Sequence, residues 1–374
     1  MNRQLSDRHL RLLRCMANQL QPTGQLLPDN PRQAVESVFA VQAQELPSAL
    51  LSLRARSRDL TASGIEQVRQ EGHSLVWTWS LRGTLHLLAA EDARWLLPLL
   101  APGLIASHQA RFRQLGWDEG NSRQGLKLLA AALQEYSVLT RLEVAALLQA
   151  KRLPYAGQAT VHLLYRAALE GLLCIGELRG SKPTYVSFAS WTGGLQPVPL
   201  DEALSRLALR YLAAYAPARP ADLASWSGLK PAQAQRAWEM VGDRLSQVEY
   251  EGQVGWMLKS QSGRLDQSIP AEPTVRLLPR FDTFLLGYAS RDFMVSPQNA
   301  KRINAGGGII HPVLLVDGRA SGTWNMQRKA EHLKISLYPF DKLPAAILPL
   351  IEREAGDLKR FLGLDEHAQL EIAW

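Results

Sequence analysis

One stretch carries most of the information about the fold: Trp77-Thr78-Trp79-Ser80-Leu81-Arg82-Gly83-Thr84-Leu85-His86-Leu87-Leu88. Polar and apolar side chains alternate in its first half, as they do along a β-strand, and the strand-like run resumes after Arg82-Gly83. The stretch therefore predicts a β-hairpin. Upstream, apolar residues at helical spacing predict helices at 5–20, 32–44, 47–57 and 61–71. Helices followed by a β-hairpin are the order of a winged helix-turn-helix.

A similar order recurs twice downstream. Thr140–Glu143 is a capping-box pattern that opens a helix, and the turn at Arg179–Pro183 separates two strand-like runs after a second helix. The elements predicted for these rounds are helices at 140–149, 158–170, 201–215, 219–229 and 230–243 and strands at 172–178, 184–188, 245–250 and 254–258.

From about residue 260 the pattern becomes β-rich. The predicted elements here are strands at 276–288, 308–316, 319–324, 332–338 and 368–373 and one helix at 344–362. We therefore predict an α+β fold in which three tandem winged helix-turn-helix units are followed by a C-terminal β-barrel-like domain. The predicted domains are 1–136 (the first unit with a helical extension), 137–198, 199–260 and the β-rich 261–374.

Composition and charge limit the classes of protein that need to be considered. The chain has 374 residues, 46% of them hydrophobic, and a net charge of +7, which is compatible with a polyanionic partner. Its only cysteines, Cys15 and Cys174, fit a reducing cytoplasm. No apolar run resembles a signal peptide or reaches the length of a membrane span, so we expect a bacterial cytoplasmic protein associated with the nucleoid.

Standard catalytic signatures are absent from the sequence. It contains no Walker A pattern, no GxGxxG after a strand, no HExxH and no GxSxG. The histidines His73, His86, His108 and His162 are too scattered to argue for a metal site, and we expect neither a metal nor another cofactor. His86 fits a histidine at the edge of the core and a DNA contact about equally.

Two glutamines, Gln42 and Gln44, stand out at the boundary between two predicted helices. Pro47 disfavours a helical conformation for Leu46 and suits the first turn of a following helix. In a regular helix, residues two apart point in different directions, so both amides can face one cleft only where the helix ends. The alternative is two polar residues on a solvated helix end.

Several basic residues are candidates for contacts with phosphate. Arg54, Arg56 and Arg58 follow the glutamines, and Lys182 lies at the tip of the second predicted hairpin. Every basic residue before Lys127 is an arginine, whose planar fork suits phosphate or guanine. A solvated helix face explains the three arginines equally well, and the composition bias of a GC-rich genome explains the lack of lysine.

Four motifs in order carry a resemblance to a known family. They are Gln42-Ala43-Gln44, Arg82-Gly83-Thr84-Leu85-His86, Arg280-Phe281-Asp282-Thr283-Phe284-Leu285-Leu286-Gly287-Tyr288, and Val316-Asp317-Gly318-Arg319 followed by Gly322-Thr323-Trp324. Together they resemble the AlkZ-type winged-helix DNA glycosylases, which are associated with self-resistance to azinomycin. The resemblance covers nearly the whole chain. Another branch of that family has aspartate at the position of Gln44, so this chain resembles the QxQ branch.

The resemblance implies a function and a site. Gln42 and Gln44 would be catalytic in a monofunctional glycosylase that hydrolyses the N-glycosidic bond of bulky N7-alkylated purines and unhooks interstrand crosslinks. The partner would be double-stranded DNA carrying such lesions. Arg82, Thr84 and His86 are the hairpin residues that we expect at the DNA surface. We expect no membrane partner, and we expect a monomer because nothing in the sequence resembles a coiled coil.

Two other functions remain open at this stage. A non-catalytic winged-helix regulator would bind DNA sequence-specifically without releasing a base. A winged-helix protein-interaction module would not bind duplex DNA at all.

Overall fold

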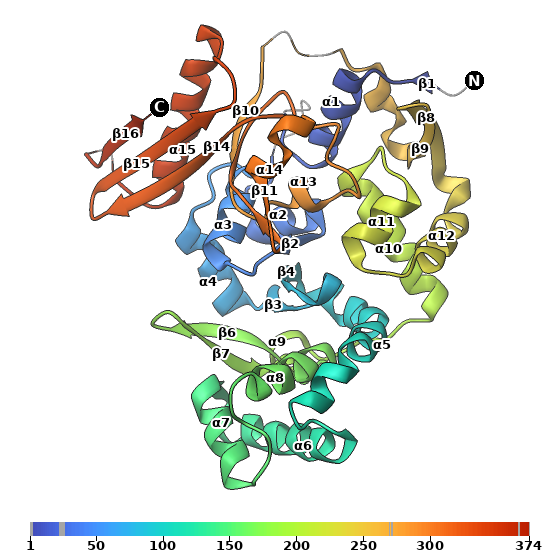
Figure 1. Ribbon diagram of the computed structural model, residues 1–374, viewed down its shortest axis with the longest axis vertical. Coiled ribbons are helices and arrows are strands. Elements are labelled where there is room, and N and C mark those ends of the chain that lie inside the picture. Colours follow the sequence, from blue (N-terminus) through green and yellow to red (C-terminus); the bar gives the residue numbers. More distant parts are fainter. Residues whose placement is uncertain (1–2, 22–26, 269, 271, 366, 374) are drawn as a thin grey trace. The chain divides into compact units, whose positions relative to one another are not determined.

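The computed structural model describes residues 3–21, 27–268, 270, 272–365 and 367–373 (Figure 1). The chain divides into two compact units, which are considered separately. Unit 1 contains Met1–Gln67 and Leu204–Trp374, and unit 2 contains Val68–Ala203.

The N-terminal part of unit 1 is mostly helical. Its elements are α1 (Asp7–Ala17), α2 (Pro31–Val38), the short strand β2 (Ala40–Gln42), α3 (Leu46–Arg54) and the start of α4 (Ala62–Gly72). The helix predicted at 32–44 is six residues too long at its C-terminus. Phe39 has a φ of +67°, which stops the α-helical course, and the next three residues form β2.

A second group of helices and a hairpin follows in the C-terminal half of the chain. Helix α10 (Leu200–Tyr215) begins at the end of unit 2, and unit 1 then contains α11 (Pro220–Ser227), α12 (Pro231–Met240), β8 (Leu245–Tyr250) and β9 (Gln253–Leu258). β1 (Arg3–Gln4) pairs with β8 in parallel. The predicted order of helices and hairpin over 201–258 is confirmed in this region.

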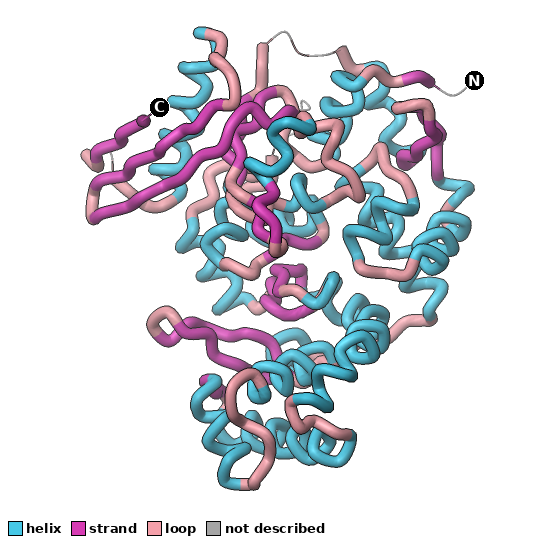
Figure 2. The backbone as a smooth tube through the Cα atoms, viewed as in Figure 1, coloured by secondary structure: helices cyan, strands magenta, loops and turns pink. Residues whose placement is uncertain are grey.

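The C-terminal sheet has five strands in the order β10-β13-β14-β15-β16. They are β10 (Val275–Leu278), β13 (Val313–Val316), β14 (Arg319–Lys329), β15 (His332–Pro339) and β16 (Gln369–Ala373). Figure 2 shows β14 and β15 as the long strands of this sheet. Among the described residues the sheet is open, with β10 and β16 as its edges, so the predicted barrel is wrong.

Helix α15 (Leu348–Phe361) packs against this sheet and explains why no closure is needed. Its residues Ile351, Ala355 and Leu358 are fully buried, and it contacts β10 and β16. The apolar face of the sheet is thus covered by a helix, as in other α+β folds. The strand predicted at 276–288 ends at Leu278, and α13 (Thr283–Leu286) follows it. The remaining short elements are α14 (Ala300–Ile303), β11 (Asn304–Gly306) and β12 (Ile309–Ile310).

Unit 2 contains two hairpins in one sheet. The first hairpin is β3 (Leu75–Trp79) with β4 (Leu85–Ala89), and the second hairpin is β6 (Leu173–Arg179) with β7 (Lys182–Ser187). β3 pairs with β6 through Trp77 and Ile175, and β5 (Val138–Thr140) pairs with β7. The sequence predicted both hairpins, but not that they share a sheet.

The helices of unit 2 are α5 (Ala90–Gln114), α6 (Glu119–Tyr136), α7 (Arg141–Ala150), α8 (Ala159–Leu169) and α9 (Phe188–Thr192). The capping box predicted for α7 is confirmed. The Glu143 backbone N–H donates to Thr140 Oγ1 at 3.3 Å, and the Thr140 N–H donates to Glu143 Oε2 at 2.6 Å. The helices and sheets of the two units confirm the α+β class. The number of winged-helix units and the domain boundaries at 136, 198 and 260 stay predictions.

Candidate active site

Gln42 is the last residue of β2, and Gln44 lies two residues further along, in the bend that precedes α3. Val41 and Ala43 are fully buried, whereas Gln42 is half-buried and Gln44 is exposed. In an extended chain, alternate residues point to the same side. The alternation of burial therefore places both amides on the side away from the core. The sequence predicted a helix end here, and the short strand β2 provides the shared direction instead.

The N-terminus of α3 follows directly. Pro47 lies in its first turn, as the sequence predicted, and Glu45 is its N-cap residue. The helix begins at Leu46, which the sequence placed outside it, and ends at Arg54 instead of residue 57. The side chain of Glu45 makes no cap hydrogen bond. Its Oε1 pairs with Arg280 Nη1 at 2.9 Å, and its Oε2 accepts a hydrogen bond from Ser48 Oγ at 3.2 Å. Because 235 positions separate Glu45 from Arg280, no local sequence pattern predicts this pair.

Arg54 does not play the role that we predicted for it. Its side chain is not exposed at all, and its guanidinium pairs with Glu354 and Asp357, each at 2.9 Å. Nη2 also donates to the backbone oxygen of Leu277 at 3.0 Å. A buried, paired guanidinium cannot reach a DNA phosphate, so this prediction is wrong. Arg54 joins α3 to α15 and β10 instead.

The neighbouring residues Arg56 and Arg58 differ in exposure to solvent. The Arg56 side chain has no exposure and pairs with the equally buried Asp282 at 2.6 Å. Arg58 is half-exposed, and its Nε lies 3.4 Å from Asp59. Arg58 is therefore solvated, but it lies beyond the end of α3, so a solvated helix face describes none of the three arginines.

The tip of the first hairpin contains two of the predicted DNA contacts, Arg82 and Thr84. Arg82 has a φ of +54° and is half-buried, and it precedes Gly83, whose φ is +72°. Thr84 is half-buried, and its Oγ1 donates to the backbone oxygen of Leu81 at 3.2 Å. The roles of Arg82 and Thr84 toward DNA stay predictions.

His86 belongs to the core. It is only 2% exposed, and its Nδ1 lies 3.1 Å from the Thr84 carbonyl oxygen. Burial, together with the charge of Arg82, lowers the pKa of His86 to about 3, so the imidazole is neutral near pH 7. Of the two alternatives from the sequence, the core histidine holds, and the predicted DNA contact at this residue is wrong because DNA cannot reach a buried ring.

Lys182 lies exposed at the start of β7, directly after the turn of the second hairpin. On the other side of the turn, Arg179 Nη1 lies 3.6 Å from Glu143 Oε1. Gly180 has a φ of +66°, which the tight reversal requires. The tip is therefore basic and accessible, and a phosphate contact at Lys182 stays a prediction.

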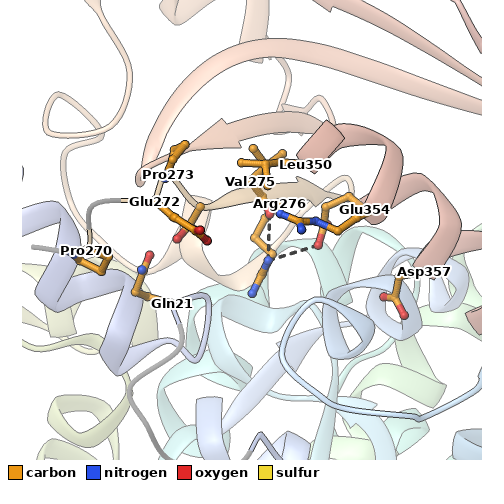
Figure 3. A pocket seen from close by; sticks show the side chains of 11 residues that line it. Gln21, Pro270, Glu272, Pro273, Val275, Arg276, Leu350, Glu354 and Asp357 are labelled. Carbon is orange, nitrogen blue, oxygen red and sulfur yellow. Dashed lines mark hydrogen bonds and ion pairs between the residues drawn. The ribbon is translucent and has the colours of Figure 1, made fainter. Parts of the chain in front are cut away.

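A separate cavity of about 540 Å³ lies in unit 1 beside the Arg54 network (Figure 3). Arg276, Glu354 and Asp357 line it, and Arg276 Nη1 pairs with Glu354 Oε1 at 3.2 Å. Neither Gln42 nor Gln44 is among the residues that line it. Arg276, Glu354 and Asp357 form ion pairs that hold α15, and the glutamines lie outside the cavity.

The chain is similar to known proteins, and this similarity identifies its family. A family model described as DNA glycosylase AlkZ-like matches residues 35–361, a range that includes both glutamines and the Arg280–Tyr288 motif. This match identifies the class of enzyme as a DNA glycosylase. The chain belongs to the AlkZ-like family.

A match in sequence and a match in structure support the assignment. The chain is 30% identical over 349 residues to an interstrand DNA cross-link repair glycosylase from Streptomyces sahachiroi, covering 88% of this chain and 90% of the relative. It is also similar to the solved structure of Streptomyces sahachiroi DNA glycosylase AlkZ, with a TM-score of 0.82, 26% identity and 99% of each chain covered. The predicted family is therefore confirmed.

Two kinds of feature are absent from the residues that the structure describes. No helix in this part of the chain is long and apolar enough to cross a membrane. Nor do three or more His, Cys, Asp or Glu side chains there form a group that could hold a metal ion.

Proposed function

We propose that this chain is a monofunctional DNA glycosylase that hydrolyses the N-glycosidic bond of bulky N7-alkylated purines, with Gln42 and Gln44 as its catalytic residues. The observation that carries the proposal is the alternation of burial around the two amides, since Gln42 is half-buried and Gln44 is exposed. Val41 and Ala43 are fully buried, so Gln42 and Gln44 point away from the core, directly before α3.

Amides suit this substrate class. A carboxamide has no useful proton affinity near neutral pH and cannot act as a general base. An N7-alkylated purine is already cationic, so it leaves without being protonated. The protein then has to hold a water and stabilise an oxocarbenium-like sugar with oriented dipoles. Two amide oxygens on one side of the chain supply such dipoles, and normal purines, which are not activated, stay intact.

The substrate extends to interstrand crosslinks in this proposal, because the Streptomyces sahachiroi relative is described as a cross-link repair glycosylase. Most glycosylases turn the target base into a closed pocket. A crosslinked base is tethered to the opposite strand and cannot leave the duplex completely. The exposure of Gln44 supports an open surface of the kind that such a lesion needs.

A lyase step would need an amine that forms a Schiff base with the sugar. No lysine precedes Lys127, so the segment around Gln42 and Gln44 supplies none. Hydrolysis by a held water is therefore proposed. The DNA contacts in this proposal are Arg82, Thr84 and Lys182. In this proposal the protein acts as a monomer in the cytoplasm, on DNA of the nucleoid.

The test is base release from duplexes that carry one N7-alkylguanine or one interstrand crosslink, with an unmodified duplex of the same sequence as the control. From the duplex with one N7-alkylguanine we expect free alkylguanine and an abasic site. From the crosslinked duplex we expect separated strands, one with an abasic site and the other still carrying the tethered base. The unmodified duplex should not react, and no strand should break until the abasic site is treated with alkali. Tight binding without base release would contradict the proposal, and sequence-specific footprints would then identify a DNA-binding regulator.

A further inference from the structure

A row of polar side chains runs from the start of α3 to just beyond its end. The row consists of Glu45, Ser48, Ser52 and Arg56, spaced by three, four and four residues, which keeps them on one face of a helix. Most of this stretch is otherwise buried. A polar face on a buried helix requires a polar partner.

The partner is the segment Arg280–Asp282. At the buried end of the row, Ser52 Oγ donates to Asp282 Oδ2 at 2.8 Å, and Arg56 Nη1 donates to the same oxygen at 2.8 Å. Arg56 Nη2 reaches Asp282 Oδ1 at 2.6 Å. Asp282 also accepts the backbone N–H of Phe284 at 2.9 Å, which caps α13. The segment is therefore fixed to α3 from inside the protein.

This anchoring holds an unusual backbone conformation next to it. Phe281 has a φ of +57°, a region that residues other than glycine rarely occupy. Such a conformation persists where its surroundings impose it. Here the buried Asp282 fixes one side of Phe281, and the turn directs Arg280 toward Glu45.

At the outer end of the row, both oxygens of Glu45 are engaged. Oε1 pairs with Arg280 Nη1 at 2.9 Å, and Oε2 accepts from Ser48 Oγ at 3.2 Å. The two charged side chains are 40% and 37% exposed. Ion pairs at this exposure contribute little to stability. The pair therefore needs another explanation, and its position is informative, because Glu45 is bonded directly to Gln44.

We infer that Glu45 and Arg280 are positioning residues for Gln44. This inference rests on the function proposed above. The ion pair fixes the backbone of Glu45, and with it the backbone of Gln44, relative to the anchored turn. It also neutralises a carboxylate beside the glutamines, which would otherwise repel the phosphates of DNA. Arg280 thus contributes to the site from a part of the chain remote in sequence.

The experiment compares Glu45→Gln, Arg280→Met and the double variant with the wild type. The measured quantities are the single-turnover rate of N7-alkylguanine release and, separately, the Kd for the same duplex. Glu45→Gln keeps the shape and one acceptor but loses the charge. We expect its rate to fall at least about tenfold, since small misplacements of a catalytic group are costly, with Kd changed less than about threefold.

For Arg280→Met we expect a similar loss of rate and a weaker Kd, because the carboxylate of Glu45 is then uncompensated. The double variant should be no slower than the slower single variant, since the two residues act as one unit. The matched control is Glu371→Gln, which removes the Lys334–Glu371 pair, whose side chains are 38% and 44% exposed. This control should leave both the rate and Kd unchanged.

The outcomes separate the inference from the function on which it rests. No base release by the wild type would overturn the proposed function itself. Wild-type rates in Glu45→Gln and Arg280→Met, with Gln44→Ala inactive, would overturn the positioning role alone. It is likewise overturned if the two losses multiply in the double variant, or if each loss of rate matches a loss of folded protein in thermal unfolding.

Discussion

Arg56 and Asp282 form an ion pair in which neither side chain has any exposure to solvent. Nη2 and Oδ1 are 2.6 Å apart, and a second bond of 2.8 Å joins Nη1 to Oδ2. Asn18 Oδ1 accepts from the same guanidinium at 2.6 Å. The pair joins the end of α3 to the turn before α13, and so it connects the segment that carries the glutamines to the C-terminal region of unit 1.

Replacing Asp282 with Asn should destabilise unit 1 strongly. The change keeps the shape of the side chain but leaves the Arg56 charge buried without a counterion, which costs about 3–5 kcal/mol. Urea unfolding measures this change. The control is Asp266→Asn, which removes an exposed pair with Arg3 and should have little effect. A loss below about 1 kcal/mol for Asp282→Asn would show that the buried pair is not a major anchor.

Gly83→Ala should destabilise unit 2 by about 1–3 kcal/mol. Gly83 has a φ of +72°, and an added Cβ would lie 2.8 Å from the Tyr165 hydroxyl oxygen. In a Tyr165→Phe background part of the loss should disappear, because the oxygen is gone while the backbone strain remains. Gly103→Ala is the matched control, since nothing lies within 4 Å of its added Cβ inside helix α5. Thermal unfolding of all four variants measures these effects, and equal losses in both backgrounds would refute the clash.

His86 should make stability depend on pH. Its pKa is lowered from 6.5 to about 3 in the folded protein, so below pH 6.5 the unfolded chain binds the proton and the folded chain does not. Stability should therefore fall with pH from about 6.5 down to about 3. The titration of His86 should lower the free energy of unfolding by about 2 kcal/mol at about pH 5 relative to about pH 7.5.

The measurement is urea unfolding of the wild type and His86→Gln at both pH values. The variant should lose less stability than the wild type as the pH falls, whatever its stability at neutral pH. If the wild type and the variant lose the same amount of stability, the folded and unfolded states do not differ in the protonation of His86.

Lys182→Ala tests the basic tip of the second hairpin. If Lys182 contacts a phosphate, the negative slope of log K against log salt concentration should become shallower by about 1 in the variant. The lesion preference should not change. Binding to an undamaged duplex between about 50 and about 200 mM salt measures the slope. Lys342→Ala, an exposed lysine outside the hairpins, should leave it unchanged. The same small effect at both positions would exclude a phosphate contact at Lys182.

The sequence predicted those elements whose signals are local. The capping box at Thr140 and the turn at Gly180 appear where the pattern placed them. The end of α2 did not, because Phe39 adopts a φ of +67° without the glycine or proline that normally marks such a break. The open C-terminal sheet was also missed, since the pattern of strands does not state whether α15 covers one face.

The predicted site residues also divide into those with a local signal in the sequence and those whose partners are distant in sequence. Gln42 and Gln44 were found through a local boundary and a family motif. Arg54 was predicted to contact DNA because its partners, Glu354 and Asp357, lie 300 and 303 positions away and leave no local signal. Arg280 was quoted as part of a motif, but its pairing with Glu45 depends on a tertiary contact that no local pattern reveals.

The most direct test of the central claim is single-turnover release of N7-alkylguanine by Gln42→Ala and Gln44→Ala. Gln33→Ala, an exposed glutamine on α2, is the control for a general effect of losing an amide in this segment. We predict that Gln33→Ala keeps the wild-type rate and that each of the other two loses at least about a hundredfold, as expected when an oriented dipole is removed from a transition state. Equal rates in the wild type and all three variants would contradict catalysis by the glutamine pair.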